Sequence, residues 1–193
     1  MPAVIMSITR NLLFSVLPCL AVVVTFAGEP SAASGRESPK WLASPHWRPA
    51  PAKGVTLETE RVTIDGKPAL RLRCDFAGGG RYAAAYLRTP VEPAFAELRL
   101  TVKTTLAPAQ VLVRFQDADG ETLQYAVQVS TADEWQDLRI DVSRPTGTFA
   151  ERQGAVLNRK ADFPLRGILL GLQPPKGATA AGDVIFSDVE LIR

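Results

Sequence analysis

The segment Val111–Ser130, VLVRFQDADGETLQYAVQVS, decides the fold class. Val113 and Phe115 alternate with Arg114 and Gln116, and the same alternation resumes after DADG. Successive side chains of a strand point to opposite faces, so period two predicts strands with one buried and one open face. Asp and Gly between two such runs are typical of a hairpin turn. The segment therefore predicts an antiparallel hairpin, and its open face is strongly polar.

Similar runs recur from Gly54 to the C-terminus, separated by turn residues. The run ELRLTVKT at 97–104 is the cleanest, and no stretch has a convincing helical period. Short strands at this spacing predict an all-β fold, an antiparallel β-sandwich of the jelly-roll kind. About nine strands are expected, at 55–62, 69–76, 81–88, 97–104, 111–116, 123–130, 135–143, 165–173 and 182–192.

The N-terminus has the pattern of a secretory signal peptide. Arg10 precedes an apolar run that ends at Ala27, and polar sequence follows. We expect residues 1–27 to be removed on export, which predicts a secreted or periplasmic protein. The alternative is an uncleaved membrane anchor, but the run is short for a span and contains Pro18.

Residues 28–53 are rich in Pro, Ala and Ser and read as an arm or linker, so the sandwich domain is expected at 54–193. Trp41 and Trp47 are unusual there: Trp47 at least is expected to fold back against the domain, although a sugar-binding platform is the alternative. After signal cleavage one cysteine remains, Cys74, so no internal disulfide can form. It shares the phase of Leu72 and Phe76, which predicts a buried, inert thiol.

Composition argues against several functions. The chain has 22 Lys and Arg against 20 Asp and Glu, a balance that offers no footprint for nucleic acid or an anionic membrane. Its one histidine, His46, lies in the arm, and no catalytic triad, nucleotide motif or His/Cys metal spacing is present. DADGE, at 117–121, resembles the start of a calcium loop but is first of all a hairpin turn. We expect no enzyme; a hydrolase using acids of the 144–162 loop would need a converging pair that the sequence does not offer.

Four segments carry a resemblance to a known group of domains. They are GKPALRL at 66–72, Tyr82 after a glycine run, Trp135 opening a strand, and GDVIFSDVEL at 182–191. Together they resemble galactose-binding-like jelly rolls, and more narrowly they are similar to carbohydrate-binding modules and the non-catalytic sandwich domains of secreted glycoside hydrolases. The resemblance implies a sugar site on the concave sheet and a structural role for Trp135, in packing either the core or an edge. It also implies a structural calcium, for which Glu58, Glu60, Asp183 and Asp188 are the candidate ligands, although alternating exposed acids on strands are the preferred explanation of these residues; no cofactor is required.

The polar face of the hairpin is the expected binding site. Gln side chains and tyrosine rings suit neutral hydroxyls and ring C–H groups, so the hypothesis is a neutral glycan. An ordinary solvated face is the alternative, with the chain as a structural domain packed on a separate glycoside hydrolase chain or envelope partner. The predicted site residues are Tyr82, Tyr86, Arg88, Arg114, Gln116, Gln124 and Gln128.

Overall fold

The computed structural model describes residues 35–88 and 93–193. The signal peptide expected at 1–27 lies outside the described residues. All the described residues belong to one unit, Ser34–Arg193. No helix within the described ranges is long and apolar enough to cross a membrane.

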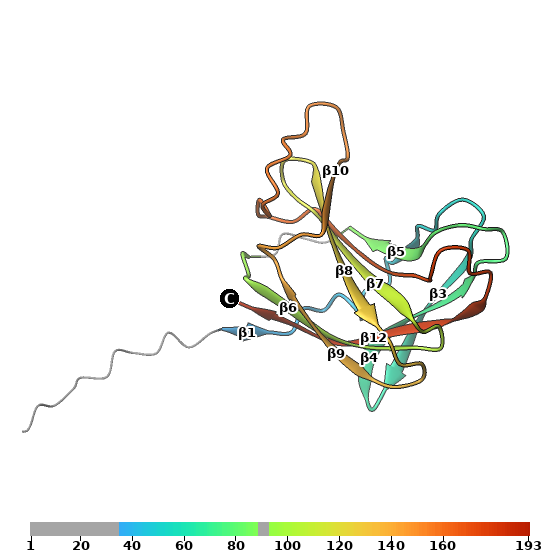
Figure 1. Cartoon of the computed structure of the whole chain (residues 1–193). Coiled ribbons are helices and arrows are strands. Elements are labelled where there is room, and N and C mark those ends of the chain that lie inside the picture. The colour runs from blue at the N-terminus through green and yellow to red at the C-terminus, as the bar shows by residue number, and fades with distance from the viewer. Residues whose placement is uncertain (1–34, 89–92) are drawn as a thin grey trace, which may run out of the picture. The chain divides into compact units, whose positions relative to one another are not determined.

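Two antiparallel sheets form a sandwich (Figure 1). Sheet A has the order β3-β4-β12-β6-β9, with β1 also paired to β12, and sheet B has the order β10-β8-β7-β11-β5-β2. The strands of sheet A are β1 (Arg36–Glu37), β3 (Thr56–Ile64), β4 (Lys67–Asp75), β6 (Glu97–Thr104), β9 (Gln136–Asp141) and β12 (Ala181–Ile192). Those of sheet B are β2 (Arg48–Pro49), β5 (Ala83–Leu87), β7 (Ala109–Gln116), β8 (Glu121–Val129), β10 (Gly147–Ala150) and β11 (Gly167–Gln173).

The all-β sandwich and its nine expected strands are confirmed, and β6 has the predicted bounds. Three further strands bring the total in the described residues to twelve. Two of them, β1 and β2, are two residues long and lie in the Pro-rich arm; the third, β10, lies in the irregular piece between β9 and β11. Segments this short carry no periodicity, and only their pairing partners make them strands.

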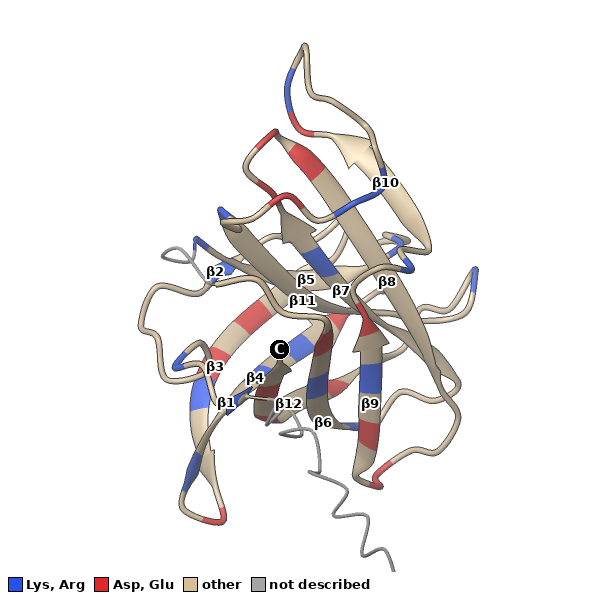
Figure 2. Ribbon diagram, turned by 90° about the vertical axis from the view of Figure 1, so that its left-hand side faces the viewer, with Lys and Arg blue, Asp and Glu red and all other residues tan. Residues whose placement is uncertain are grey.

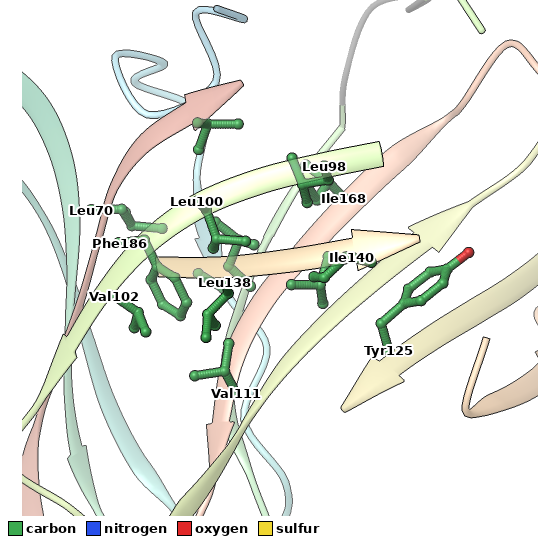
Figure 3. Close-up of a cluster of buried hydrophobic side chains, with 14 of the residues drawn as sticks. Leu70, Leu98, Leu100, Val102, Val111, Tyr125, Leu138, Ile140, Ile168 and Phe186 are labelled. Carbon is green, nitrogen blue, oxygen red and sulfur yellow. The ribbon is translucent and has the colours of Figure 1, made fainter. Parts of the chain in front are cut away.

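The core lies between the sheets and follows the predicted alternation. Val111, Val113 and Phe115 of β7 are fully buried, and so are alternate residues of β6. Tyr125 lies with them, and its buried hydroxyl finds a hydrogen-bond partner by donating to the Val142 carbonyl at 2.7 Å. Figure 3 shows side chains of the two sheets meeting in this cluster: Leu70, Leu98, Leu100, Val102, Leu138, Ile140 and Phe186 from sheet A, and Val111, Tyr125 and Ile168 from sheet B.

The arm packs into the sandwich from Gly35 onward. β1 extends sheet A beside β12, and β2 pairs with β5 of sheet B. Trp41 and Trp47 are 2% and 8% exposed, and the Trp47 indole N–H donates to the Trp41 carbonyl at 2.9 Å. The sandwich unit therefore begins near Ser34 rather than at Gly54, and both indoles are core residues rather than sugar platforms.

Cys74 is buried in the same core, as its phase predicts. It is unpaired, and desolvation by burial raises the pKa of its thiol to about 12. The thiol is therefore neutral near pH 7, which makes it a poor nucleophile.

Candidate functional site

The open face of sheet B carries most of the predicted site. Charge is concentrated on sheet A, whereas the strands of sheet B are almost uncharged (Figure 2). Within the strands of sheet B, the charged residues are Arg48, Arg114 and the fully buried Glu121. Gln110 and Gln116 mark the two ends of this face along β7, about 20 Å apart at about 3.3 Å per residue. The face is therefore long, polar and nearly neutral.

The strand order settles which predicted residues are neighbours. β7 and β8 are adjacent, so Arg114 lies directly opposite Gln124. β5 is not adjacent to β7, because β11 runs between them. Tyr86 of β5 and Arg114 of β7 both pair with the same residue of β11, Leu169, and therefore lie in one row across the sheet.

Tyr86 reaches across β11 because that strand has a glycine in its path. A Cβ at Gly167 would lie 2.5 Å from the Tyr86 ring and hydroxyl, so the ring occupies the space that any larger residue would fill. The Tyr86 hydroxyl donates to Gln116 Oε1 on β7 at 2.7 Å. Burial is the main cause that raises the pKa of Tyr86, and the positive charge of Arg88 opposes the rise. The missing side chain at Gly167 thus lets Tyr86 and Gln116, two predicted site residues on strands that are not adjacent, form a hydrogen bond.

Arg114 is held at the centre of the face. Its guanidinium lies 4.8 Å from the centroid of the Tyr82 ring and 5.3 Å from that of Phe149, within the range of cation–π attraction. Its Nε also donates to Gln124 Oε1 at 2.8 Å. Phe149, on β10, is 43% exposed and was not predicted as a site residue. The irregular sequence around it gave no strand signal from which its face could be read.

Beside Arg114 the face has a row of apolar residues, most of them buried, and then a row of amides. Ala84, Gly171, Leu112 and Ala126 pair in register across four strands. One row further on, Gln173, Gln110 and Gln128 pair across β11, β7 and β8. Of these three glutamines, only Gln128 is among the predicted site residues. Gln110 lies in the same alternating phase of β7 as Arg114, and this phase could have assigned it to the open face.

Two hollows lie at the glutamine end. One, of about 360 Å³, is lined by Pro108, Ala109, Gln110, Gln128, Gln173, Pro174, Pro175 and Lys176. The other, of about 450 Å³, is also lined by residues 173–176 and includes Gly79, Gly80 and Arg81. Concave surface beside convergent polar groups is where small ligands bind. Arg88, the remaining predicted residue, is exposed just beyond the end of β5.

The DADGE segment is a hairpin turn, as expected. Asp117 Oδ1 accepts the backbone N–H groups of Asp119 and Glu121 at 3.0 and 2.8 Å, and Gly120 has φ 88°. The buried Glu121 carboxylate accepts hydrogen bonds from the backbone N–H groups of Asn158 and Arg159, and these bonds hold the loop between β10 and β11 against the turn. Burial is the main cause that raises the pKa of Asp117.

The four carboxylates proposed as calcium ligands each pair with a Lys or Arg side chain. Asp183 lies 3.5 Å from Arg71, and Asp188 lies 2.6 Å from Lys67. Glu58 and Glu60 both face Arg73, at 3.6 and 3.1 Å. Among the residues the structure describes, no group of three or more His, Cys, Asp or Glu side chains is placed to hold a metal ion. The geometry is that of an alternating charged sheet face.

Trp135 is not in the core, one of the two packing positions expected for it; it directly precedes β9, the edge strand of sheet A. Its side chain is 42% exposed on the outer face of sheet A, because it precedes β9 in the phase of Asp137 rather than that of the buried Leu138.

Comparison with known proteins bears on the fold. Neither a family model nor a curated protein matches the sequence. Among solved structures, a family 11 carbohydrate-binding module from Clostridium thermocellum, in complex with a β-1,3-1,4-mixed-linked tetrasaccharide, matches with a TM-score of 0.59 and 12% identity, covering 83% of this chain and 97% of that chain. The sandwich has the fold of a carbohydrate-binding module. An exo-β-agarase also matches, with a TM-score of 0.52 and 14% identity over 77% of this chain, but the match covers only 24% of that chain. The resemblance read from the sequence is thus confirmed at the level of the fold.

Proposed function

We propose that this protein is an exported, non-catalytic carbohydrate-binding domain that holds a neutral glycan along the open face of sheet B. The observation that carries the proposal is the arrangement around Arg114, where aromatic rings and amide groups lie side by side on a nearly uncharged face. Aromatic rings pack against sugar C–H groups, and amides both donate to and accept from hydroxyls. Export rests on the signal-peptide pattern of residues 1–27.

A neutral glycan suits this face better than a charged one. Arg114 is its central cation, and its guanidinium is already committed to two rings and to Gln124. The groups left for a ligand are mainly the amides of Gln110 and Gln173 and the exposed amide of Gln128, whose Nε2 also donates to the Val129 carbonyl at 3.2 Å. Binding should therefore depend little on salt, since exposed charge pairs are the interactions that salt screens.

A β-1,3-1,4-mixed-linked glucan is the first ligand to test, because the matched family 11 module was solved with a tetrasaccharide of this linkage. Titration calorimetry of the mature protein would measure binding at about 0.05 and about 0.5 M salt, where similar affinities are expected. Tyr82→Ala should weaken binding about tenfold, since it removes one ring of the platform. Arg139→Ala is the matched control, because Arg139 is exposed on the outer face of sheet A. Equal binding by Tyr82→Ala and Arg139→Ala would refute this face as the site.

The second candidate is a structural domain that packs on a separate glycoside hydrolase chain. It is favoured by the agarase match, in which the same sandwich is a quarter of a larger enzyme. Failure of the folded wild type to bind any glycan of a broad panel, together with co-purification with a glycoside hydrolase, would favour this alternative.

A further inference from the structure

Among the described residues, Trp135 is the one tryptophan with a largely exposed side chain. Trp41 and Trp47 are nearly inaccessible, whereas Trp135 is 42% exposed at the start of β9. It lies on the outer face of sheet A, on the side of the sandwich opposite the open face of sheet B. An exposed indole offers a large apolar ring face on an otherwise charged sheet face, where a ligand can stack on it.

The indole forms one wall of a small hollow of about 140 Å³. The hollow is also lined by Thr101 of β6, by Ser187 of β12, and by Asp65 and Lys67 at the β3–β4 connection. Ile64 and Asp188 complete the lining. The hollow is much smaller than the two hollows at the glutamine end of sheet B, so a single ring suits it better than a chain.

A β-bulge directs Asp188 into this lining. The register between β12 and β6 shifts between Ser187 and Glu190, and Asp188 has φ 48°. Non-glycine residues adopt this conformation at a cost, and bulges of this kind re-aim side chains beside functional sites. The Asp188 carboxylate is fixed by Lys67 Nζ at 2.6 Å. The strained backbone and the exposed indole are independent observations on the same hollow.

We propose that this hollow is a second carbohydrate site that takes one sugar ring, stacked on Trp135 and hydrogen-bonded to Asp188 and Lys67. A fixed carboxylate accepts from two neighbouring hydroxyls, and the ammonium donates to a third oxygen. The site shares no residue with the open face of sheet B and does not depend on binding there. Two sites on opposite faces would let one domain contact two glycan chains and raise its overall retention on a polysaccharide.

Tryptophan fluorescence isolates this site. Trp41 and Trp47 are shielded, so acrylamide quenches mainly Trp135, and the open face of sheet B contains no tryptophan. The probes are the methyl glycosides of glucose, galactose and mannose at up to about 100 mM, which saturates a millimolar site. A stacked sugar covers one of the two ring faces, so at least one glycoside should lower the quenching constant about twofold.

Two variants separate this site from the open face. Asp188→Gly keeps the left-handed backbone conformation without strain and removes the carboxylate, so protection should be lost while the melting temperature is kept. Tyr82→Ala should retain full protection, whatever it does to glycan binding on sheet B. If Asp188→Gly does not fold, Lys67→Met is the substitute and should weaken protection. Absence of protection by all three glycosides, or unchanged protection in the folded variant, would overturn the second site.

Discussion

Gly167→Ala tests the geometry of the open face most directly. The new Cβ would lie 2.5 Å from Cε2 and the hydroxyl oxygen of Tyr86, whereas non-bonded carbon contacts are about 3.5–4 Å. The ring must therefore move by about 1 Å, which breaks the 2.7 Å hydrogen bond from Tyr86 to Gln116. All three nearest atoms belong to Tyr86, so the whole effect should pass through that one side chain.

The magnitude follows from two opposing effects. Overpacking costs typically about 1–3 kcal/mol, which includes the loss of a hydrogen bond worth about 1 kcal/mol. Alanine in a strand is favoured over glycine by about 0.5–1 kcal/mol, because it loses less backbone entropy on folding. Gly167→Ala should therefore lower the free energy of unfolding by about 1–2 kcal/mol in the wild type. In a Tyr86→Ala background the clash is gone, and the same change should raise it by about 0.5–1 kcal/mol.

The assay is urea unfolding of the wild type, the two single variants and the double variant. The coupling between the two positions should be about 1.5–3 kcal/mol, and the sign of the Gly167→Ala effect should reverse between backgrounds. Gly147→Ala is the matched control, because a Cβ there meets nothing closer than 3.8 Å. The same destabilisation by Gly167→Ala in both backgrounds would refute the crossing of β11 by Tyr86.

Four further outcomes are expected. Phe115→Ala should cost about 3–5 kcal/mol of stability, because Phe115 is fully buried, whereas Gln116→Ala should cost about 1 kcal/mol and weaken glycan binding. Thermal melts and affinity measurements compare the two variants. If Gln116→Ala did not fold, the assignment of Gln116 to the open face of β7 would be wrong. Native Cys74 should resist a bulky thiol reagent at pH 8, since burial raises the pKa of the thiol to about 12, and rapid labelling monitored by mass spectrometry would refute its burial. N-terminal sequencing of the exported protein should find a chain that starts after Ala27, and a retained Met1 would contradict the signal peptide. Calcium re-addition after chelation should leave the melting temperature unchanged, because each of the four predicted ligands already pairs with a Lys or Arg side chain. A rise in melting temperature that Asp183→Asn abolishes would establish the metal site.

The contrast between prediction and structure is clearest at the site. Arg114, Gln116 and Gln124 were correctly assigned to one face, because β7 and β8 form a hairpin whose register follows from its turn. The relation of Tyr86 to that face could not be predicted, because β11 lies more than fifty residues further along the chain and inserts between β5 and β7. Phe149 was missed for the same reason: β10 is defined by its pairing with β8, and its four residues have no readable period.

The sequence alone determined what depends on near neighbours in the chain: the strands, their turns, and the inward phase of residues such as Val113, Phe115 and Cys74. A strand's period is local, and burial of every second side chain follows once one face is apolar. The tertiary structure decided what depends on strand order and on the bulge in β12. It placed Gly167 beneath Tyr86, set three glutamines in one row, and left Trp135 exposed beside Asp188. These relations join strands far apart in sequence, and the packing of the whole sandwich, rather than any local pattern, fixes which strand lies beside which.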